Sequence, residues 1–573
     1  MKWHMQNGVI NKKNNFQLFN YNNNNNYSIS TIISFVENSS NNDDDIKIGE
    51  EAEQLKVSNP SFSIFNIIKL FGKNYNEIVG RKDLWPFNIY NNEKENKPYI
   101  KIKGKNNKEE KTISYYFDEI LTLFLKKVFD NFFKNIVIDK KEEVEKIKLI
   151  EINMVISVPN YFNYIQREMI KQIFISKLFP KNEIYRKSKI FIKSNIYGKY
   201  NIQLNNIKIE SVSNLVSFSL INNEMINKNI KNNSINYLII YIDGGSVNIS
   251  IVNISNNKNS YSIELKGIGG AEFGEEDFVD NFVYICLSDF KDKVKKNCLS
   301  SPIALAKLRK SINIVKNCFN KQDIFQTEVN INKLYDEIDL KMTINKNDYY
   351  KSCIGLFRKI IYLVKDTILN SNIKIKNIND IILLGNIAQN SKLKIMISEL
   401  FKDDNQIIYN KLIDKKYKDN DLNNHIIYGA IIQCFNSNMA LPKYKFINLT
   451  YSSYGIETLN GLMDIVIEKG SNIPIKFNKY IKIRKPDENE KNMININIYE
   501  GENKYIKNNR LISSNFIDIN NFKNEKNDEN NIELLFQFFI DSNYVLNVYI
   551  LDKISFKKKY ECLINLDKIK NRY

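Results

Sequence analysis

The chain of 573 residues is too long for one hydrophobic core, and its hydrophobic content of 43% indicates a folded protein of two or more domains. The net charge of +18 is compatible with nucleic-acid binding, but Lys, Asn and Ile are over-used everywhere, so we attribute the charge to compositional bias and do not expect a nucleic-acid partner. Two histidines and six scattered cysteines without a C-x-x-C pair argue against His-based metal sites, Ser-His-Asp triads and disulfides, so we expect no metal site.

Hydrophobic periodicity predicts alternating strands and helices over the first three quarters of the chain. In the N-terminal part the expected elements are a strand at Ser30–Val36, helices at 62–72 and 114–138, a strand at 148–158, and a helix from about Gln166. Residues 176–208 are basic and contain few turn residues, which predicts an insertion. Later elements are helices at 275–297 and 302–320, a strand-turn-helix at Asp380–Leu400, and a helix at 423–437.

The pattern changes at about residue 449 to short alternating runs with closely spaced turn residues, as in I-N-I-N-I-Y at 494–499. This pattern predicts an all-β module. Residues 440–450 are the expected linker, and we expect no sheet to cross it. No apolar run is long enough to span a membrane, and residues 1–20 lack the pattern of a signal peptide.

One motif carries chemistry. Residues 237–251 read Y-L-I-I-Y-I-D-G-G-S-V-N-I-S-I, which is two apolar strands joined by a tight turn. The two glycines allow a backbone to approach a phosphate closely. Such a phosphate-binding hairpin, of the actin and sugar-kinase kind, usually carries one aspartate at the end of its first strand and another after its turn. Tyr241 and Asn248 stand at these two places.

Several further motifs resemble the 70-kilodalton heat-shock chaperone family, the DnaK type. They are V-P-N-Y-F-N-Y-I-Q-R at 158–167, G-E-E-D-F at 274–278, L-R-K-S-I-N-I-V-K at 308–316, Y-G-I-E-T-L-N-G-L-M at 454–463 and Y-E-G-E at 499–502. The match is collinear from about residue 28 to residue 568.

The resemblance implies an α/β actin-like (ribonuclease H-like) two-lobed ATPase domain, followed by an all-β sandwich that grips extended peptides. We expect the first domain at 1–439, the linker at 440–450 and the sandwich at 451–573. The family's first phosphate loop precedes the start of this sequence, and no helical lid is expected because the sequence stops at Tyr573.

Within that resemblance the nucleotide site is degenerate. The family's catalytic Lys is replaced by Ile68, with Lys69 next to it, and a β-branched apolar group cannot bind phosphate. Around the base, the matching positions are Asn313, Lys316, Asn317, Asn320, Asn386 and Gln389. The remnants of the site are Gly244, Gly245, Ser246, Lys316 and Gly385, and Glu210 matches a family acid if the register is right. No catalytic residue is assigned beyond Glu210, and ATP and Mg²⁺ are cofactors by resemblance only.

Two other sites are implied. Pro159, Arg167 and Lys171 match residues that relay nucleotide state to the peptide domain, or they are a turn proline and two surface charges. The linker K-Y-K-F-I-N-L departs from the family's acidic, leucine-rich segment, which puts linker docking in doubt. The family's peptide pocket matches Ile456, Leu459, Ile481, Ile494 and Ile496, which are otherwise inward positions of a sandwich; Arg484 replaces a small residue of its arch.

Three functions are compatible with these observations. The first is a divergent chaperone or co-chaperone that binds extended apolar segments of unfolded clients with lost or strongly reduced ATP binding and hydrolysis, which would make it a pseudo-ATPase. The second is an ATP-dependent folding chaperone read from an incomplete N-terminus. The third is a scaffold or basic nucleic-acid-associated protein. A J-domain co-chaperone or nucleotide-exchange-type partner and a cytoplasmic location are expected, unless a targeting signal is missing.

Overall fold

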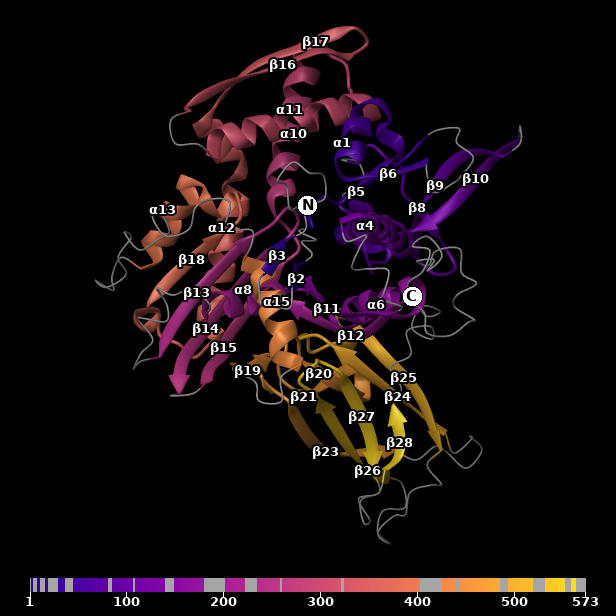
Figure 1. Ribbon diagram of the computed structural model, residues 1–573, viewed down its shortest axis with the longest axis vertical. Coiled ribbons are helices and arrows are strands. Elements are labelled where there is room, and N and C mark those ends of the chain that lie inside the picture. The colour runs from indigo at the N-terminus through magenta and orange to yellow at the C-terminus, as the bar shows by residue number, and fades with distance from the viewer. Residues whose placement is uncertain are drawn as a thin grey trace.

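A computed structural model describes most of the chain (Figure 1). The described residues are 2–3, 8–10, 16–18, 29–36, 45–80, 85–106, 109–139, 149–179, 201–221, 234–257, 260–320, 324–401, 425–438, 444–484, 493–518, 531–551 and 558–562.

Residues 29–179 form the part that we call lobe I, at the right of Figure 1. Its strands and helices are β4 (Ile29–Ser30), β5 (Ile32–Phe35), β6 (Ile46–Ile48), α1 (Gly49–Ser58), η2 (Pro60–Phe62), β7 (Ser63–Phe65), α2 (Ile67–Leu70), α3 (Tyr75–Ile78), β8 (Tyr90–Asn92), β9 (Lys97–Asn106), β10 (Glu109–Tyr116), α4 (Phe117–Asp139), β11 (Leu149–Val158), α6 (Tyr164–Gln172) and η4 (Ile173–Leu178). Helix α4 buries Phe117, Leu121, Phe124 and Val128, which recur at helical spacing and therefore face one core.

Three short N-terminal strands precede lobe I: β1 (Lys2–Trp3), β2 (Gly8–Ile10) and β3 (Phe16–Leu18). Strand β1 pairs with β4, and β2 pairs with β3.

Residues 201–438 add the part that we call lobe II, together with one strand of lobe I. The elements are β12 (Asn201–Ser211), α8 (Val212–Ile221), β13 (Ile235–Ile242), β14 (Val247–Asn257), β15 (Ser260–Ala271), α10 (Glu275–Val294), α11 (Pro302–Asn320), β16 (Gln326–Tyr335), β17 (Ile338–Asn345), α12 (Lys346–Asn370), η6 (Ile375–Asn377), β18 (Asp380–Leu384), η7 (Ile387–Gln389), α13 (Ser391–Leu400) and α15 (His425–Asn438). Strand β12 runs parallel to β11 and so belongs with lobe I.

The centre of lobe II is a six-stranded sheet in the order β18-β13-β14-β15-β19-β22. Side chains alternate across its faces, as strand geometry requires. Leu238, Ile240 and Ile242 of β13 join one core with α10, α11, α12 and α13, whereas Ile239 and Tyr241 join a second core with α8 and α15. The hairpin between β13 and β14 is therefore held in a sheet that is covered on both faces.

The C-terminal part is a β-sandwich, orange to yellow at the bottom of Figure 1. Its strands are β20 (Tyr454–Thr458), β21 (Leu462–Ile467), β22 (Asn472–Ile473), β23 (Ile475–Arg484), β24 (Met493–Glu500), β25 (Arg510–Asp518), β26 (Asn531–Ile540), β27 (Leu546–Leu551) and β28 (Lys558–Cys562), with short helices η9 (Leu459–Gly461) and η10 (Ile506–Asn508). Two four-stranded sheets, β21-β20-β24-β25 and β23-β26-β27-β28, enclose one apolar core. The mixed α/β part followed by an all-β part fits the expected fold class.

The linker differs from the sequence-based expectation. Residues 444–449 form β19, which pairs in parallel with β15 and antiparallel with β22 of the sandwich. One sheet therefore crosses residues 440–450, where we expected none. The apolar residues of K-Y-K-F-I-N-L explain this pairing, because Phe446 and Leu449 pack into the core beneath the sheet. The domain limits at 439 and 451 stay predictions.

Most predicted elements are present within a few residues, including α4, β11, α10, α11, α13 and α15. Two predictions were wrong in part. The helix predicted over 62–72 is interrupted by β7, because Ser63 to Phe65 complete a three-stranded sheet with β5 and β6. The predicted insertion at 176–208 is too long, because Asn201 onward forms β12; residues 180–200 lie outside the described residues.

Candidate functional site: a hairpin enclosed by an acidic helix start

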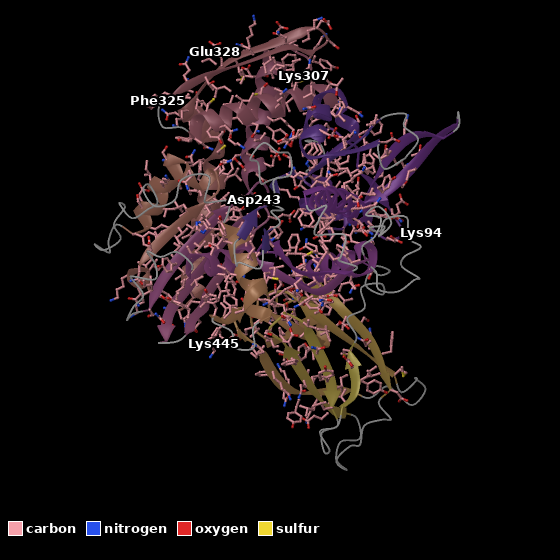
Figure 2. All side chains as sticks on the ribbon, viewed as in Figure 1. Lys94, Asp243, Lys307, Phe325, Glu328 and Lys445 are labelled. Atoms are coloured by element: carbon pink, nitrogen blue, oxygen red, sulfur yellow. The ribbon has the colours of Figure 1, made fainter. Side chains whose placement is uncertain are left out.

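The glycine turn between β13 and β14 is built as the sequence predicted. Tyr241 pairs with Asn248, and the N–H of Asp243 donates to the carbonyl of Ser246 at 2.9 Å across the turn. Gly244, Gly245 and Ser246 are buried. Figure 2 shows Asp243, the first residue after β13, near the middle of the molecule between the two lobes.

The start of α10 covers this turn. The N–H groups of Glu275 and Glu276 donate to the carbonyls of Asp243 and Gly244 at 2.9 and 2.8 Å. The first turn of a helix normally offers free N–H groups to an anion, and here the hairpin itself accepts two of them. A Cβ atom on Gly274 would lie 2.2 Å from the Asp243 carbonyl oxygen, so only glycine allows this close approach.

Gly385, which directly follows β18, contacts the same hairpin. It has a φ of +92°, and a Cβ atom there would lie 1.9 Å from the carbonyl oxygen of Ile242. The structure thus brings Gly244, Gly245, Ser246 and Gly385 together.

The two positions at which the family carries aspartates are occupied by neutral, fully buried groups. The Tyr241 side chain is 4% exposed and packs into the core beneath the sheet, and burial raises the pKa of its phenol well above the usual value. Asn248 is 0% exposed. Neither side chain can supply the carboxylate oxygens that hold Mg²⁺ and its waters.

Asn248 instead organises a neutral network. Its Oδ1 accepts from the N–H of Asn160 at 2.7 Å, and its Nδ2 donates to Ser246 Oγ at 2.9 Å. Asn160 Nδ2 in turn donates to Ser213 Oγ and to the carbonyl of Gly269 at 2.7 and 3.0 Å. The network ties the hairpin to the loop after β11 and satisfies these buried polar atoms without any ligand.

Lys316 is buried in α11, and its Nζ lies 3.0 Å from Glu275 Oε1. Asn386 Nδ2 donates to the same oxygen at 3.2 Å. An internal carboxylate therefore binds two of the groups that the resemblance assigns to nucleotide. Of the other predicted base contacts, Asn313 and Asn317 are exposed, and Asn320 accepts from Asn390.

Lys69 lies across the junction between the lobes. Its Nζ is 2.6 Å from Asp277 Oδ2, with side-chain exposures of 4% and 16%. Ile68, at the place of the family's catalytic Lys, is 0% exposed and belongs to the core of lobe I. Lys69, the sequence neighbour of that position, is therefore already paired with α10.

Arg309 is the third buried cation that pairs with carboxylates of α10. Its guanidinium pairs with Glu276 at 2.7 Å and with Asp280, and it lies 5.0 Å from the centre of the Phe65 ring of lobe I. Although burial alone would raise the pKa of Glu276, the nearby cations, including Arg309, hold it below its usual range. For Asp280 burial outweighs Arg309, and its pKa is raised.

Sequence reasoning missed the acidic groups of this site. Glu275, Glu276 and Asp277 stand in the motif G-E-E-D-F and Asp280 follows it, but no rule connected these four carboxylates to the cations that they contact. Their signal was the spacing G-E-E-D-F-V-D at a helix start, where four carboxylates fall within two helical turns. Burial raises the pKa of Asp243 to about 6.

These residues do not fit Mg²⁺-ATP. The cations Lys69, Arg309 and Lys316 are each paired with a carboxylate, and the positions of the family's aspartates are neutral. A polyphosphate would therefore meet cations that carboxylates of α10 already neutralise, rather than a cationic pocket. Among the residues that the structure describes, no group of three His, Cys, Asp or Glu side chains is placed to hold a metal ion.

Of the three predicted coupling residues, Arg167 contacts the sandwich. Arg167 Nε donates to the carbonyl of Phe162 at 2.9 Å and Nη2 to that of Pro159 at 3.4 Å, while the guanidinium lies 4.0 Å from the Tyr451 ring. Tyr451 stacks on Tyr544 with ring centres 4.5 Å apart. By contrast, Lys171 makes an ion pair with Glu168 of its own helix at 3.9 Å.

Glu210 belongs to this junction as well. Its oxygens accept from Gln433 Nε2 at 2.6 Å and Asn214 Nδ2 at 2.7 Å, and Lys208 Nζ lies at 3.0 Å. Asn214 Nδ2 also lies 3.3 Å from Tyr451 Oη. Glu210 is therefore a buried carboxylate whose oxygens are already hydrogen-bonded within the protein.

The predicted peptide residues lie in the sandwich core. Ile456 and Ile496 are 2% and 3% exposed, and Ile481 and Ile494 are half-buried at the edge of the same core. The side chains of Leu459 and Arg484 lie outside the described set. A separate cavity of about 520 Å³ is formed by residues 85–89 of lobe I and 297–305 of lobe II, and its lining does not include the hairpin.

Comparison with known proteins agrees with the motifs. A family model described as Hsp70 protein matches residues 21–174 and 225–571. "Heat shock cognate 70 kDa protein 3" of Dictyostelium discoideum is 26% identical over 535 residues, which cover 92% of this chain and 74% of that protein. "Heat shock 70 kDa protein" of Trichophyton rubrum is 24% identical over 517 residues, covering 88% and 68%.

Proposed function

The chain belongs to the Hsp70 family, and on that premise we propose that it is a chaperone that has lost, or nearly lost, ATP binding and hydrolysis. It binds extended apolar segments of unfolded polypeptides through its β-sandwich, in the manner that the family resemblance implies.

The observation that carries the first half is the charge pairing at the hairpin. Lys69, Lys316 and Arg309 each contact a carboxylate of α10, at 2.6 Å, 3.0 Å and 2.7 Å. A nucleotide would have to displace these carboxylates from buried cations, and breaking a buried pair costs about 3–5 kcal/mol when one charge is left alone. The cost of breaking these ion pairs therefore cancels the binding energy that phosphate contacts with the same cations would supply.

The residues needed for hydrolysis are also missing, whether or not ATP binds. Phosphoryl transfer depends on positioned cations and metal-bound waters, and removing one such group typically lowers the rate by about 10² to 10³. The buried Tyr241, Asn248 and Ile68 supply none of these groups.

Steady-state ATPase assays test this half of the proposal. The wild-type chain and the Tyr241→Asp variant should both show no turnover above a protein-free blank, because the substitution restores one carboxylate but no cation. Wild-type turnover at a rate typical of the family would overturn the proposal. Thermal melts with and without Mg²⁺-ATP add a binding readout, and we expect equal midpoints.

Client binding rests on the sandwich. Main-chain hydrogen bonds to an extended peptide plus an apolar pocket would give affinity, and the half-buried Ile494 is the best-placed probe. Ile494→Trp should weaken binding of a labelled leucine-rich heptapeptide in fluorescence anisotropy. Met493→Trp is the matched control, since Met493 precedes Ile494 on the opposite face of β24 and is 42% exposed. Equal binding by both variants would show that Ile494 only fills the core. Ile496 is a poorer probe, because its burial makes a larger side chain destabilising.

A second candidate is an ATP-dependent chaperone, and one observation favours it. Contacts between the lobes and the sandwich support it, because the Arg167 guanidinium lies 4.0 Å from the Tyr451 ring and because β19 pairs with β15. If ATP accelerated peptide release in the anisotropy assay, this candidate would replace the first.

A J-domain co-chaperone and a cytoplasmic location complete the proposal by family analogy. In the described part of the chain, no helix is both long and apolar enough to cross a membrane.

A further inference from the structure

Glu500 is a buried carboxyl group at the end of β24, where the sandwich meets lobe I. Its side chain is 4% exposed. Both of its oxygens lie 3.0 Å from the backbone N–H of Tyr164, the first residue of α6. Glu500 of one part of the molecule therefore accepts a hydrogen bond from the start of a helix of the other.

The surrounding contacts show that this junction is closely packed. Tyr164 and Ile165 of α6 lie in the apolar core of the sandwich, with exposures of 8% and 7%. At its edge, Arg510 of β25 makes an ion pair with Glu77 of lobe I at 3.2 Å. In Figure 1 the sandwich lies directly below α6 and β12. Separating the two parts would return Glu500 to water.

The groups that face Glu500 come from both sides. Tyr454 Oη of β20 lies 3.5 Å from Oε1. Arg167 of α6 and Arg510 of β25 favour the ionised form, and Glu502 opposes it. Within the described residues no arginine or lysine lies within ion-pair distance of Glu500, and the guanidinium of Arg167 is directed to backbone carbonyls and to Tyr451.

We propose that Glu500 is a proton-operated latch of the docked sandwich, in which the neutral carboxyl group stabilises docking on α6 and its ionised form weakens it. The neutral group keeps accepting from the Tyr164 N–H, and Tyr454 Oη, which donates to Oε1 at 3.5 Å in the structure, can instead accept the carboxyl O–H. The ionised group, by contrast, stays buried without a cationic partner. This latch does not depend on whether the hairpin site binds ATP.

The direction of the pH dependence of docking follows from the burial of Glu500. Burial raises the pKa of Glu500 from about 4.5 to about 7, and the hydrogen bond from Tyr164 and the two arginines only partly offset this. The docked state thus binds the proton more tightly than the undocked state, so docking strengthens as pH falls through about 7 towards 4.5. These two values imply that the docking equilibrium increases about tenfold from about pH 8 to about pH 6.

Hydrogen–deuterium exchange of the full chain measures this equilibrium, because the Tyr164 N–H is protected only in the docked state. Protection factors of the α6 peptide, corrected for the intrinsic exchange rate at each pH, should rise about tenfold from about pH 8 to about pH 6, with a plateau above about pH 7.5. In Glu500→Gln the amide still accepts from Tyr164 but does not titrate, and protection should change less than about twofold.

The matched control is Glu468→Gln, which removes an exposed carboxylate of the same sandwich and should keep the wild-type slope. A wild-type protection factor that does not change with pH would overturn the proposal, as would a wild-type slope without the plateau. A Glu500→Gln variant that retains the full slope would assign the titration to another group. If Glu500→Gln does not fold, the wild-type slope and its plateau decide.

Discussion

Replacing Lys69 by Met tests whether internal ion pairs, rather than a nucleotide, hold the two lobes together. Lys69 Nζ lies 2.6 Å from Asp277 Oδ2, and the two side chains are 4% and 16% exposed. At this separation the attraction is about 6 kcal/mol for an effective dielectric constant of about 20, and desolvation of both ions offsets much of it.

Lys69→Met leaves Asp277 as an unpaired, largely buried charge. Fully buried pairs lose about 3–5 kcal/mol in this situation. Asp277 keeps some exposure and still accepts from the N–H of Gly274 at 2.7 Å, so we expect a loss of about 2–3 kcal/mol in the free energy of unfolding. Asp277→Asn combined with Lys69→Met should recover more than half of that loss, because no charge is left alone.

Urea unfolding of the wild type, both single variants and the double variant completes the cycle. The surface pair Lys333 and Glu337, with exposures of 67% and 75%, is the control, and Lys333→Met should change stability by less than about 0.5 kcal/mol. A Lys69→Met variant as stable as the wild type would refute the idea that the Lys69–Asp277 ion pair holds the lobes together. Single effects that simply add in the double variant would refute it as well.

Two further predictions concern the hairpin and the junction. The folded pKa of Asp243 is about 6, above its usual 3.8, so its contribution to stability is present below about pH 4 and is lost as pH rises through about 6. Asp243→Asn should therefore stabilise the chain by about 1–2 kcal/mol at pH 8 and by almost nothing at pH 4. Urea unfolding midpoints at the two pH values would show this difference. Arg167→Lys loses the stacking on Tyr451 and the two carbonyl hydrogen bonds, and should destabilise by about 1–3 kcal/mol in thermal unfolding, whereas Lys171→Ala, which removes a 3.9 Å surface pair, should change little; equal effects of the two would contradict the junction.

The sequence predicted the fold where periodicity and turn residues agree. The strand 148–158, the helix at 302–320 and the glycine hairpin are present because their apolar spacing matches one element and their ends carry strong turn signals. The prediction failed at Ser63–Phe65, because three apolar and small residues form either a helical turn or an edge strand, and pairing with β5 decides between them.

For the hairpin site, the sequence predicted only which family residues are replaced. Tyr241, Asn248 and Ile68 could be identified as replacements by matching motifs, residue by residue. The ion pairs that the structure shows in their place could not be predicted. Lys69 and Asp277, for example, are separated by 208 positions in the chain, and only the folded lobes bring them together. The same holds for Glu500 and Tyr164, which are 336 positions apart. Charge pairing over such separations leaves no local pattern in a single sequence.

Isothermal titration of the wild-type chain with Mg²⁺-ATP tests the central claim most directly. Because the cations at the hairpin are already paired with Glu275, Glu276 and Asp277, the account predicts no saturable heat at micromolar protein concentrations. Glu275→Gly, which removes the carboxylate that pairs with Lys316, serves as the paired titration and should bind at most weakly, since Tyr241 and Asn248 still replace the hairpin carboxylates. A saturable wild-type isotherm with micromolar or tighter affinity would contradict the account.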